Sequence, residues 1–126
     1  MRILIDTHVL LWGLQDEDRL SDRVRNLLPV EDVWISVASL WEIIAKVQVG
    51  KLSLPRPVGE YLSEKLLGNG VSVLPLTFAH VRRLADLPLH HRDPFDRILV
   101  AQSLEEKLPL ISADPLFKKY SVQLIW

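Results

Sequence analysis

The chain has 126 residues, of which 48% are hydrophobic and 25% are charged, and its net charge is −1 at pH 7. This composition suits one folded domain over residues 1–126 and is the opposite of the low-hydrophobicity, high-charge composition of disordered chains. The near balance of charge excludes binding to nucleic acid through a general excess of lysine and arginine, so any such role has to rest on a local site.

Cysteine is absent, which excludes disulfides, thiolate metal sites and cysteine nucleophiles. No apolar run approaches the roughly 18 residues of a membrane span. The first residues, MRILIDTHVLLWG, lack the small-residue cleavage site of a secretory signal. We therefore expect a cytoplasmic protein that does not enter a membrane.

Short apolar strands alternate with helical segments along the chain. Strands are expected at residues 2–5, 33–36, 71–74, 108–112 and 122–126. Helices are expected at residues 7–13, 21–28, from 36 or 39 to about 49, from 57 to about 68, 77–87, 94–107 and 115–119. Strands separated by helices form βαβ units, and strands that are apolar throughout are covered on both faces. The pattern predicts a three-layer α/β/α domain with a central parallel sheet.

Four carboxylates are expected to meet at one edge of this sheet. Asp6 follows the first strand, Asp114 follows the strand at 108–112, and Glu42 lies in the helix that leaves the second strand. Asp96 is in the first turn of the helix that leads into strand 108–112, and such a helix begins at the carboxyl edge of a parallel sheet. Ligands of open α/β sheets bind beyond that edge.

Each carboxylate also has a structural interpretation. Asp6 and Asp114 can cap helices, and Asp93 can cap the helix in which Asp96 favours the dipole. Taken together, however, clustered carboxylates repel one another unless a cation is present. With no cysteine and no histidine pair at helical spacing, such a rim suits Mg²⁺ or Mn²⁺ better than zinc.

The helix that carries Glu42 is expected to bury one apolar stripe. That stripe consists of Val37, Leu40, Trp41 and Ile44. Glu42 would then lie on the far side, where an ion pair with Lys46 contributes only ~0.3–0.5 kcal/mol. Ser39 and Glu42 also match a capping box, which is a purely structural role.

Four passages together resemble the PIN-domain ribonucleases, particularly the VapC-type toxins of type II toxin–antitoxin systems. They are ILIDTHVLLW, ISVASLWEIIAKVQVGKLSL, HHRDPFDRILVAQSLEEKLPLISAD and the closing strand. Their order and spacing match the family from residue 2 to the end. The resemblance implies a PIN-like fold and a metal-dependent endoribonuclease.

The resemblance also implies roles for individual residues. The catalytic and metal positions are Asp6, Glu42, Asp96 and Asp114. Supporting positions are Thr7, Ser112, Asp93 and Arg97. We expect Asp93 to cap the helix and Asp96 to bind metal, with the reverse assignment left open, and Arg97 to contact either a phosphate or a carboxylate.

The implied cofactor is Mg²⁺ (or Mn²⁺), which would polarise a phosphate oxygen and lower the pKa of an attacking water. The implied partners are an RNA substrate, a cognate antitoxin and a second copy in a homodimer. The histidines have no spacing specific to a mechanism, and we expect them to be hydrogen-bonded or exposed. These are His8, His80, His90 and His91.

Two alternatives remain. One is a catalytically idle PIN-like domain that binds RNA or protein, against which stand the four filled acidic positions. The other is a receiver-type phosphoacceptor domain, which expects paired acids after the first strand and an aspartate at the end of the third. Here Asp6 is followed by Thr7 and His8, and the third strand runs into Pro75.

Overall fold

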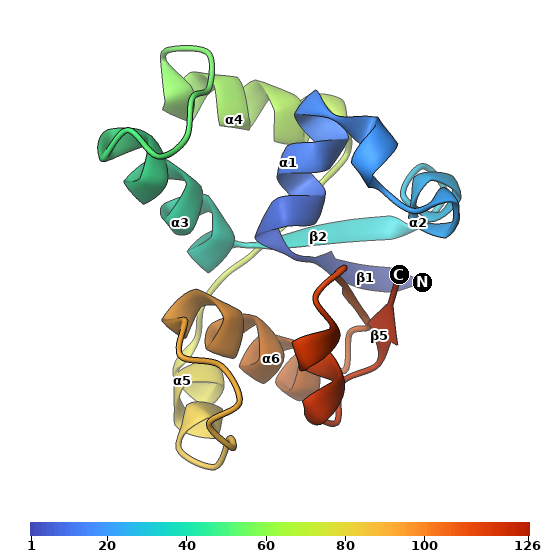
Figure 1. The fold of residues 1–126 in the computed structure, drawn as a ribbon, viewed down its shortest axis with the longest axis vertical. Coiled ribbons are helices and arrows are strands. Elements are labelled where there is room, and N and C mark those ends of the chain that lie inside the picture. The colour runs from blue at the N-terminus through green and yellow to red at the C-terminus, as the bar shows by residue number, and fades with distance from the viewer.

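The computed structural model describes residues 1–126 and shows a five-stranded sheet between two groups of helices (Figure 1). The strands are β1 (Arg2–Ile5), β2 (Asp32–Ser36), β3 (Ser72–Leu74), β4 (Leu110–Ile111) and β5 (Leu124–Ile125). The α-helices are α1 (Thr7–Gln15), α2 (Asp22–Leu27), α3 (Val37–Gln48), α4 (Val58–Gly68), α5 (Phe78–Leu84) and α6 (Pro94–Glu106). Two 3₁₀ helices, η1 (Glu17–Arg19) and η2 (Pro115–Lys119), complete the chain. No helix has the length and apolar character that crossing a membrane requires.

The sheet is parallel throughout, with the strand order β3-β2-β1-β4-β5. The chain runs outward from the central β1 to β2 and β3, and then returns to place β4 and β5 on the other side of β1. The strand order therefore reverses between β1 and β4. In open α/β sheets the crevice beyond the carboxyl ends at such a reversal is where ligands bind.

Two apolar cores lie on opposite faces of the sheet, because successive side chains of a strand alternate between faces. Ile3 and Ile5 of β1 pack in a core with Val24 of α2, whereas Leu4 packs in the other core with Leu99 of α6. In Figure 1, α1 to α4 lie on one side of the strands and α5 and α6 on the other. The expected three-layer architecture with a parallel sheet is thereby confirmed.

Some elements are shorter than the sequence suggests. Only two residues pair in β4 and in β5, where five were expected in each. The helix expected at residues 77–87 ends at Leu84. From the end of the helix onward, the backbone carbonyls face Arg97. Its guanidinium donates hydrogen bonds to the carbonyls of Leu84, Leu87 and Pro88.

The prediction of which face of α3 is buried is wrong. Val37, Trp41 and Ile44 are exposed, Trp41 by 65%, and of the expected stripe Leu40 alone packs against a core. The buried residues of α3 are instead Ala38, Ser39, Glu42 and Ile43. Packing against α1 and α6 turns this mixed face inward, and there Glu42 accepts a hydrogen bond from Thr7.

The C-terminal end of α6 offers a test of the backbone geometry. Lys107 has a left-handed conformation, with φ of 55° and ψ of 45°. A β-carbon makes this conformation unfavourable, and glycine adopts it freely. We expect Lys107→Gly to raise the free energy of unfolding by about 0.5–1 kcal/mol, measured by urea denaturation. Lys107→Ala removes the same charge but keeps the β-carbon, so an equal gain in that variant would contradict the explanation.

Candidate metal site at the carboxyl edge

Asp6 is fixed at the end of β1, where the strand passes into α1. One carboxylate oxygen accepts a hydrogen bond from the Val9 backbone N–H at 2.8 Å, and only 6% of the residue is exposed. Burial raises the pKa of Asp6, and the charge of Asp114 raises it further. Hydrogen bonds from the Ser112 hydroxyl and from Val9 oppose this rise in pKa. Asp6 therefore caps α1 and is also electrostatically coupled to Asp114, which follows the adjacent strand β4.

Glu42 is buried on α3, with only 4% exposed. Its Oε1 accepts a hydrogen bond from the Thr7 hydroxyl at 2.7 Å, which links α3 to the start of α1. Its Oε2 lies 2.8 Å from Lys46 Nζ, so the expected i,i+4 pair forms, but at a buried carboxylate instead of on an open surface. The hydrogen bond to Glu42 raises the pKa of Lys46, and the charges of Asp93 and Asp96 add to that rise. Lys46 thus belongs to the electrostatic environment of the acidic residues.

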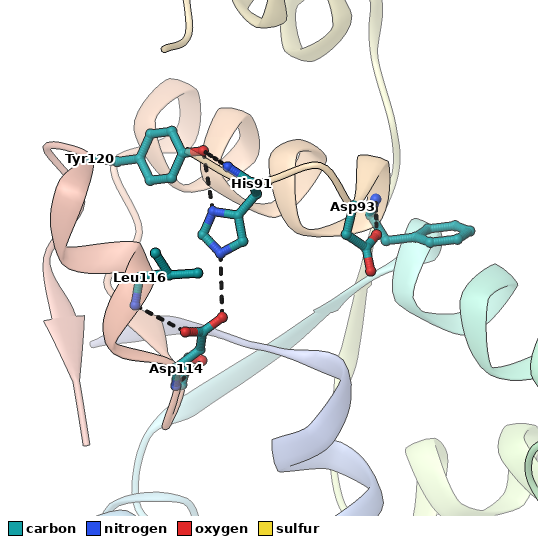
Figure 2. Close-up of polar contacts among 7 residues, drawn as sticks. His91, Asp93, Asp114, Leu116 and Tyr120 are labelled. Atoms are coloured by element: carbon teal, nitrogen blue, oxygen red, sulfur yellow. Dashed lines mark hydrogen bonds and ion pairs between the residues drawn. The ribbon is translucent and has the colours of Figure 1, made fainter. Parts of the chain in front are cut away.

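Asp93 and Asp96 differ in their surroundings. Asp93 is exposed, and its carboxylate caps α6 by accepting a hydrogen bond from the Phe95 N–H at 2.8 Å (Figure 2). Asp96 is partly buried one turn later. One carboxylate oxygen of Asp96, one of Asp114 and a ring nitrogen of His91 all lie within 4.8 Å of one another.

The pKa of Asp96 reflects both its burial and the neighbouring negative charges. Its pKa is raised from 3.8 to about 7, first by burial and then by the charges of Asp93, Glu42 and Asp114. The nearby His91 acts in the opposite direction. Carboxylates from widely separated parts of the chain therefore influence one another electrostatically.

His91 was not expected at this site. It is 6% exposed, and its ring is stacked on Phe117 with the centroids 4.7 Å apart. Figure 2 shows the ring between two partners: Nε2 is 3.3 Å from an Asp114 oxygen, and Nδ1 is 3.2 Å from the Tyr120 hydroxyl. The Tyr120 hydroxyl also accepts the His91 backbone N–H at 3.1 Å. The position of His91 just before α6 was a usable signal, but its orientation depends on Tyr120, 29 residues further along.

Arg97 is engaged with the backbone. Its guanidinium donates to the carbonyl of Pro88 at 2.8 Å and to those of Leu84 and Leu87 at 3.4 Å. It pairs with no carboxylate. The side chain instead ties the start of α6 to the end of α5, and so fixes the segment that carries His91.

The donor atoms at this edge fit a divalent cation. Carboxylate oxygens dominate the set, one imidazole nitrogen accompanies them, and no thiolate is present. Hard divalent cations prefer such oxygen-rich sets. A cation would also offset the repulsion that raises the pKa of Asp96. The structure brings ligand atoms of His91, Asp96 and Asp114 close enough together to hold it. Asp6 lies outside this group and is coupled to it through the charge of Asp114, and both Glu42 oxygens are engaged by Thr7 and Lys46.

The pKa of Asp96 predicts a gain in stability when its charge is removed. In the unfolded chain Asp96 ionises near pH 4, but in the folded protein it ionises only near pH 7. The wild-type protein therefore loses stability relative to Asp96→Asn as pH rises through this interval, and the difference is constant above it. Three pKa units would amount to about 4 kcal/mol, but solvent screens this partly exposed carboxylate, so we expect about 1–2 kcal/mol at pH 8.

Urea denaturation in EDTA at pH 4, 6 and 8 measures this difference. Asp86→Asn, at an exposed carboxylate outside the cluster, is the matched control and should show no such dependence. A difference between wild type and Asp96→Asn that stays constant from pH 4 to pH 8 would show that the pKa of the Asp96 carboxylate is not raised in the folded protein.

Solved structures share this fold over nearly their whole length. The chain is similar to VapBC2 from Rickettsia felis bound to a promoter DNA fragment, with 13% identity, a TM-score of 0.74, and coverage of 99% of this chain and 98% of that one. It is similar to FitAcB from Neisseria gonorrhoeae, with 20% identity, a TM-score of 0.70, and coverage of 100% and 97%. For DNA-bound VapBC from Salmonella typhimurium the values are 16%, 0.69, and 99% and 97%.

At these identities the likeness concerns the fold. No curated protein sequence matches the chain. A family model described as "PIN domain", however, matches residues 3–123, which is nearly the whole chain and includes every acidic residue of the candidate site. The chain therefore belongs to the PIN domain family.

Proposed function

We propose that the protein is a metal-dependent endoribonuclease and acts as the toxin of a toxin–antitoxin pair in the cytoplasm. The proposal is supported by the electrostatics of the carboxylates at the carboxyl edge. Burial, followed by the charges of Asp93, Glu42 and Asp114, raises the pKa of Asp96 to about 7. Burial and the charge of Asp114 likewise raise the pKa of Asp6. The reversal of strand order between β1 and β4 also supports the proposal, because α/β sheets bind ligands beyond the carboxyl ends at such a point. The choice of RNA as substrate rests on the family resemblance.

The cation would be Mg²⁺ or Mn²⁺, held by the carboxylates of Asp6, Glu42, Asp96 and Asp114. When bound, it supplies a Lewis acid for a phosphate oxygen and lowers the pKa of a coordinated water. The surrounding side chains fix the carboxylates that would hold it. Thr7 orients Glu42, and the Ser112 hydroxyl is hydrogen-bonded to Asp6. No side-chain nucleophile is needed for this hydrolysis.

Lys46 adds a positive charge beside the carboxylates. It is partly exposed, and besides pairing with Glu42 it feels the charges of Asp93 and Asp96. A phosphodiester that approaches an otherwise acidic site meets repulsion, and a flexible ammonium group reduces that repulsion. We therefore propose that Lys46 positions the substrate phosphate.

A protein partner is supported by two observations. A similar solved structure from Klebsiella pneumoniae, with 14% identity and a TM-score of 0.66, is described as a toxin–antitoxin complex. The apolar stripe of Val37, Trp41 and Ile44 on α3 is also exposed. Trp41 packs edge-on against Phe95 with the centroids 5.2 Å apart, which makes the surface continuous with the start of α6. We propose an antitoxin and a second copy of the chain as partners.

The two earlier alternatives differ in their support. A receiver-type domain would place its acceptor aspartate at the end of the third strand, but β3 ends at Leu74, is followed by Pro75, and lies at the edge of the sheet. Membership of the PIN family also stands against that alternative. An idle PIN-like binding domain has the same fold as a nuclease, and only an activity measurement separates the two.

Cleavage of a mixed RNA pool in Mg²⁺ or Mn²⁺ is the direct test. We expect cleavage that EDTA abolishes, and a loss of at least about 100-fold in Asp6→Asn and Asp96→Asn, because each removes a metal ligand. Both variants should remain folded, since asparagine at position 6 can still cap α1. Asp86→Asn should cleave like the wild type. Binding of RNA without cleavage in any metal would favour the idle domain.

The exposed stripe on α3 predicts the oligomeric state. We expect the isolated wild-type protein to sediment as a dimer at micromolar concentration and Trp41→Glu to sediment as a monomer, because the buried charge would be unpaired at the interface. Leu67→Glu serves as the control, because Leu67 is also an exposed apolar residue but lies on α4, and this variant should remain dimeric. A monomeric wild type, or a dimeric Trp41→Glu, would contradict the interface.

A further inference from the structure

We infer that His91 supplies a nitrogen ligand to the divalent cation at this site, and that the site therefore favours first-row transition-metal ions such as Mn²⁺ over Mg²⁺. The inference rests on the proposed function, because it assumes that a cation binds among the carboxylates. It goes beyond that function by naming a ligand outside the acidic set and the metal selectivity that follows from it.

The distances suit a shared ion. In an octahedral site with bonds of about 2.1 Å, neighbouring ligand atoms are about 3 Å apart and opposite ones about 4 Å apart. His91 Nε2 lies 3.3 Å from an Asp114 oxygen, and a carboxylate oxygen of Asp96 completes a group with no separation above 4.8 Å. Small side-chain movements are enough to bring the three atoms onto one cation.

The imidazole is already oriented for this role. Its ring is buried and packs against two aromatic neighbours, with centroid distances of 4.7 Å to Phe117 and 5.5 Å to Tyr120. Little side-chain freedom remains to be lost when a metal binds. Histidines that bind metals usually donate their other ring N–H to a fixed acceptor, which sets the orientation of the ring.

Tyr120 permits both tautomers of His91. When the Tyr120 hydroxyl donates to Nδ1, Nε2 carries the proton and donates to Asp114, which suits the protein without metal. When Nδ1 carries the proton, the hydroxyl can accept it together with the His91 backbone N–H, since the oxygen has two lone pairs. Nε2 is then free to bind the cation. The same hydrogen-bond partners therefore serve both states.

A neutral nitrogen also suits the charge of the site. A further carboxylate would add negative charge beside Asp96 and Asp114. An imidazole adds a donor atom without negative charge. The other histidines are placed differently: His8 and His90 are exposed, and the ring of His80 accepts a hydrogen bond from the Thr77 N–H at 3.0 Å.

The metal preference follows from the ligand. Mg²⁺ favours oxygen donors and keeps much of its water, whereas imidazole binds first-row transition metals more strongly. Loss of His91 should therefore weaken Mn²⁺ binding much more than Mg²⁺ binding. We expect His91→Asn to raise the dissociation constant for Mn²⁺ at least about 10-fold. The dissociation constant for Mg²⁺, measured by competition with Mn²⁺, should rise less than about 3-fold.

Pulsed electron paramagnetic resonance of the full chain loaded with Mn²⁺ provides a readout independent of cleavage. Imidazole coordination produces ¹⁴N modulation of the bound Mn²⁺ signal. We expect this modulation in the wild type, its retention in His8→Asn and His90→Asn, and its loss in His91→Asn. Even if His91→Asn folds poorly, loss of the modulation in His8→Asn or His90→Asn would show that another histidine is the ligand.

The outcomes separate this inference from the proposed function. Mn²⁺ that binds the wild type but not Asp96→Asn, with no ¹⁴N modulation, would overturn the role of His91 and leave the acidic metal site intact. Modulation that persists in folded His91→Asn would overturn it as well. Failure of the wild type to bind Mn²⁺ or Mg²⁺ at all would overturn both proposals.

Discussion

The structure concentrates negative charge beyond the carboxyl ends of β1 and β4, and much of the surrounding chain compensates for it. Asp6 is buried and Asp96 has a pKa of about 7, so the folded protein carries an unfavourable electrostatic energy at this edge. Thr7 and Lys46 offset part of it at Glu42. Such a cluster destabilises the fold unless something positive binds, which is why we interpret it as a functional site.

The remaining architecture delivers these groups from distant positions to one point. The parallel sheet aligns the ends of β1 and β4, and α6 begins at the same edge because it leads back into β4. The Arg97 guanidinium holds the segment between α5 and α6, and Tyr120 holds the imidazole of His91 from the opposite side. Backbone topology thus brings the carboxylates to one edge, while hydrogen bonds from Arg97 and to Tyr120 fix the segment that carries His91.

Much of this arrangement could be predicted from sequence because it depends on local patterns. Apolar strands, capping residues and the position of Asp96 one turn into a helix are all local features. The orientation of α3 could not be predicted, because the partner of the buried Glu42 is Thr7, 35 residues away, and because Trp41 is exposed despite its hydrophobicity. His91 was missed for a similar reason, since its orientation depends on Tyr120 and Phe117. Tertiary contacts decided what sequence periodicity could not.

The central claim is that a divalent cation binds among these carboxylates. Anomalous diffraction from crystals soaked in Mn²⁺ tests it most directly. We expect an anomalous peak enclosed by Asp6, Asp96 and Asp114, and its disappearance in crystals of Asp96→Asn. An occupied Mn²⁺ site elsewhere on the protein, with no peak at this edge of the sheet, would contradict the account.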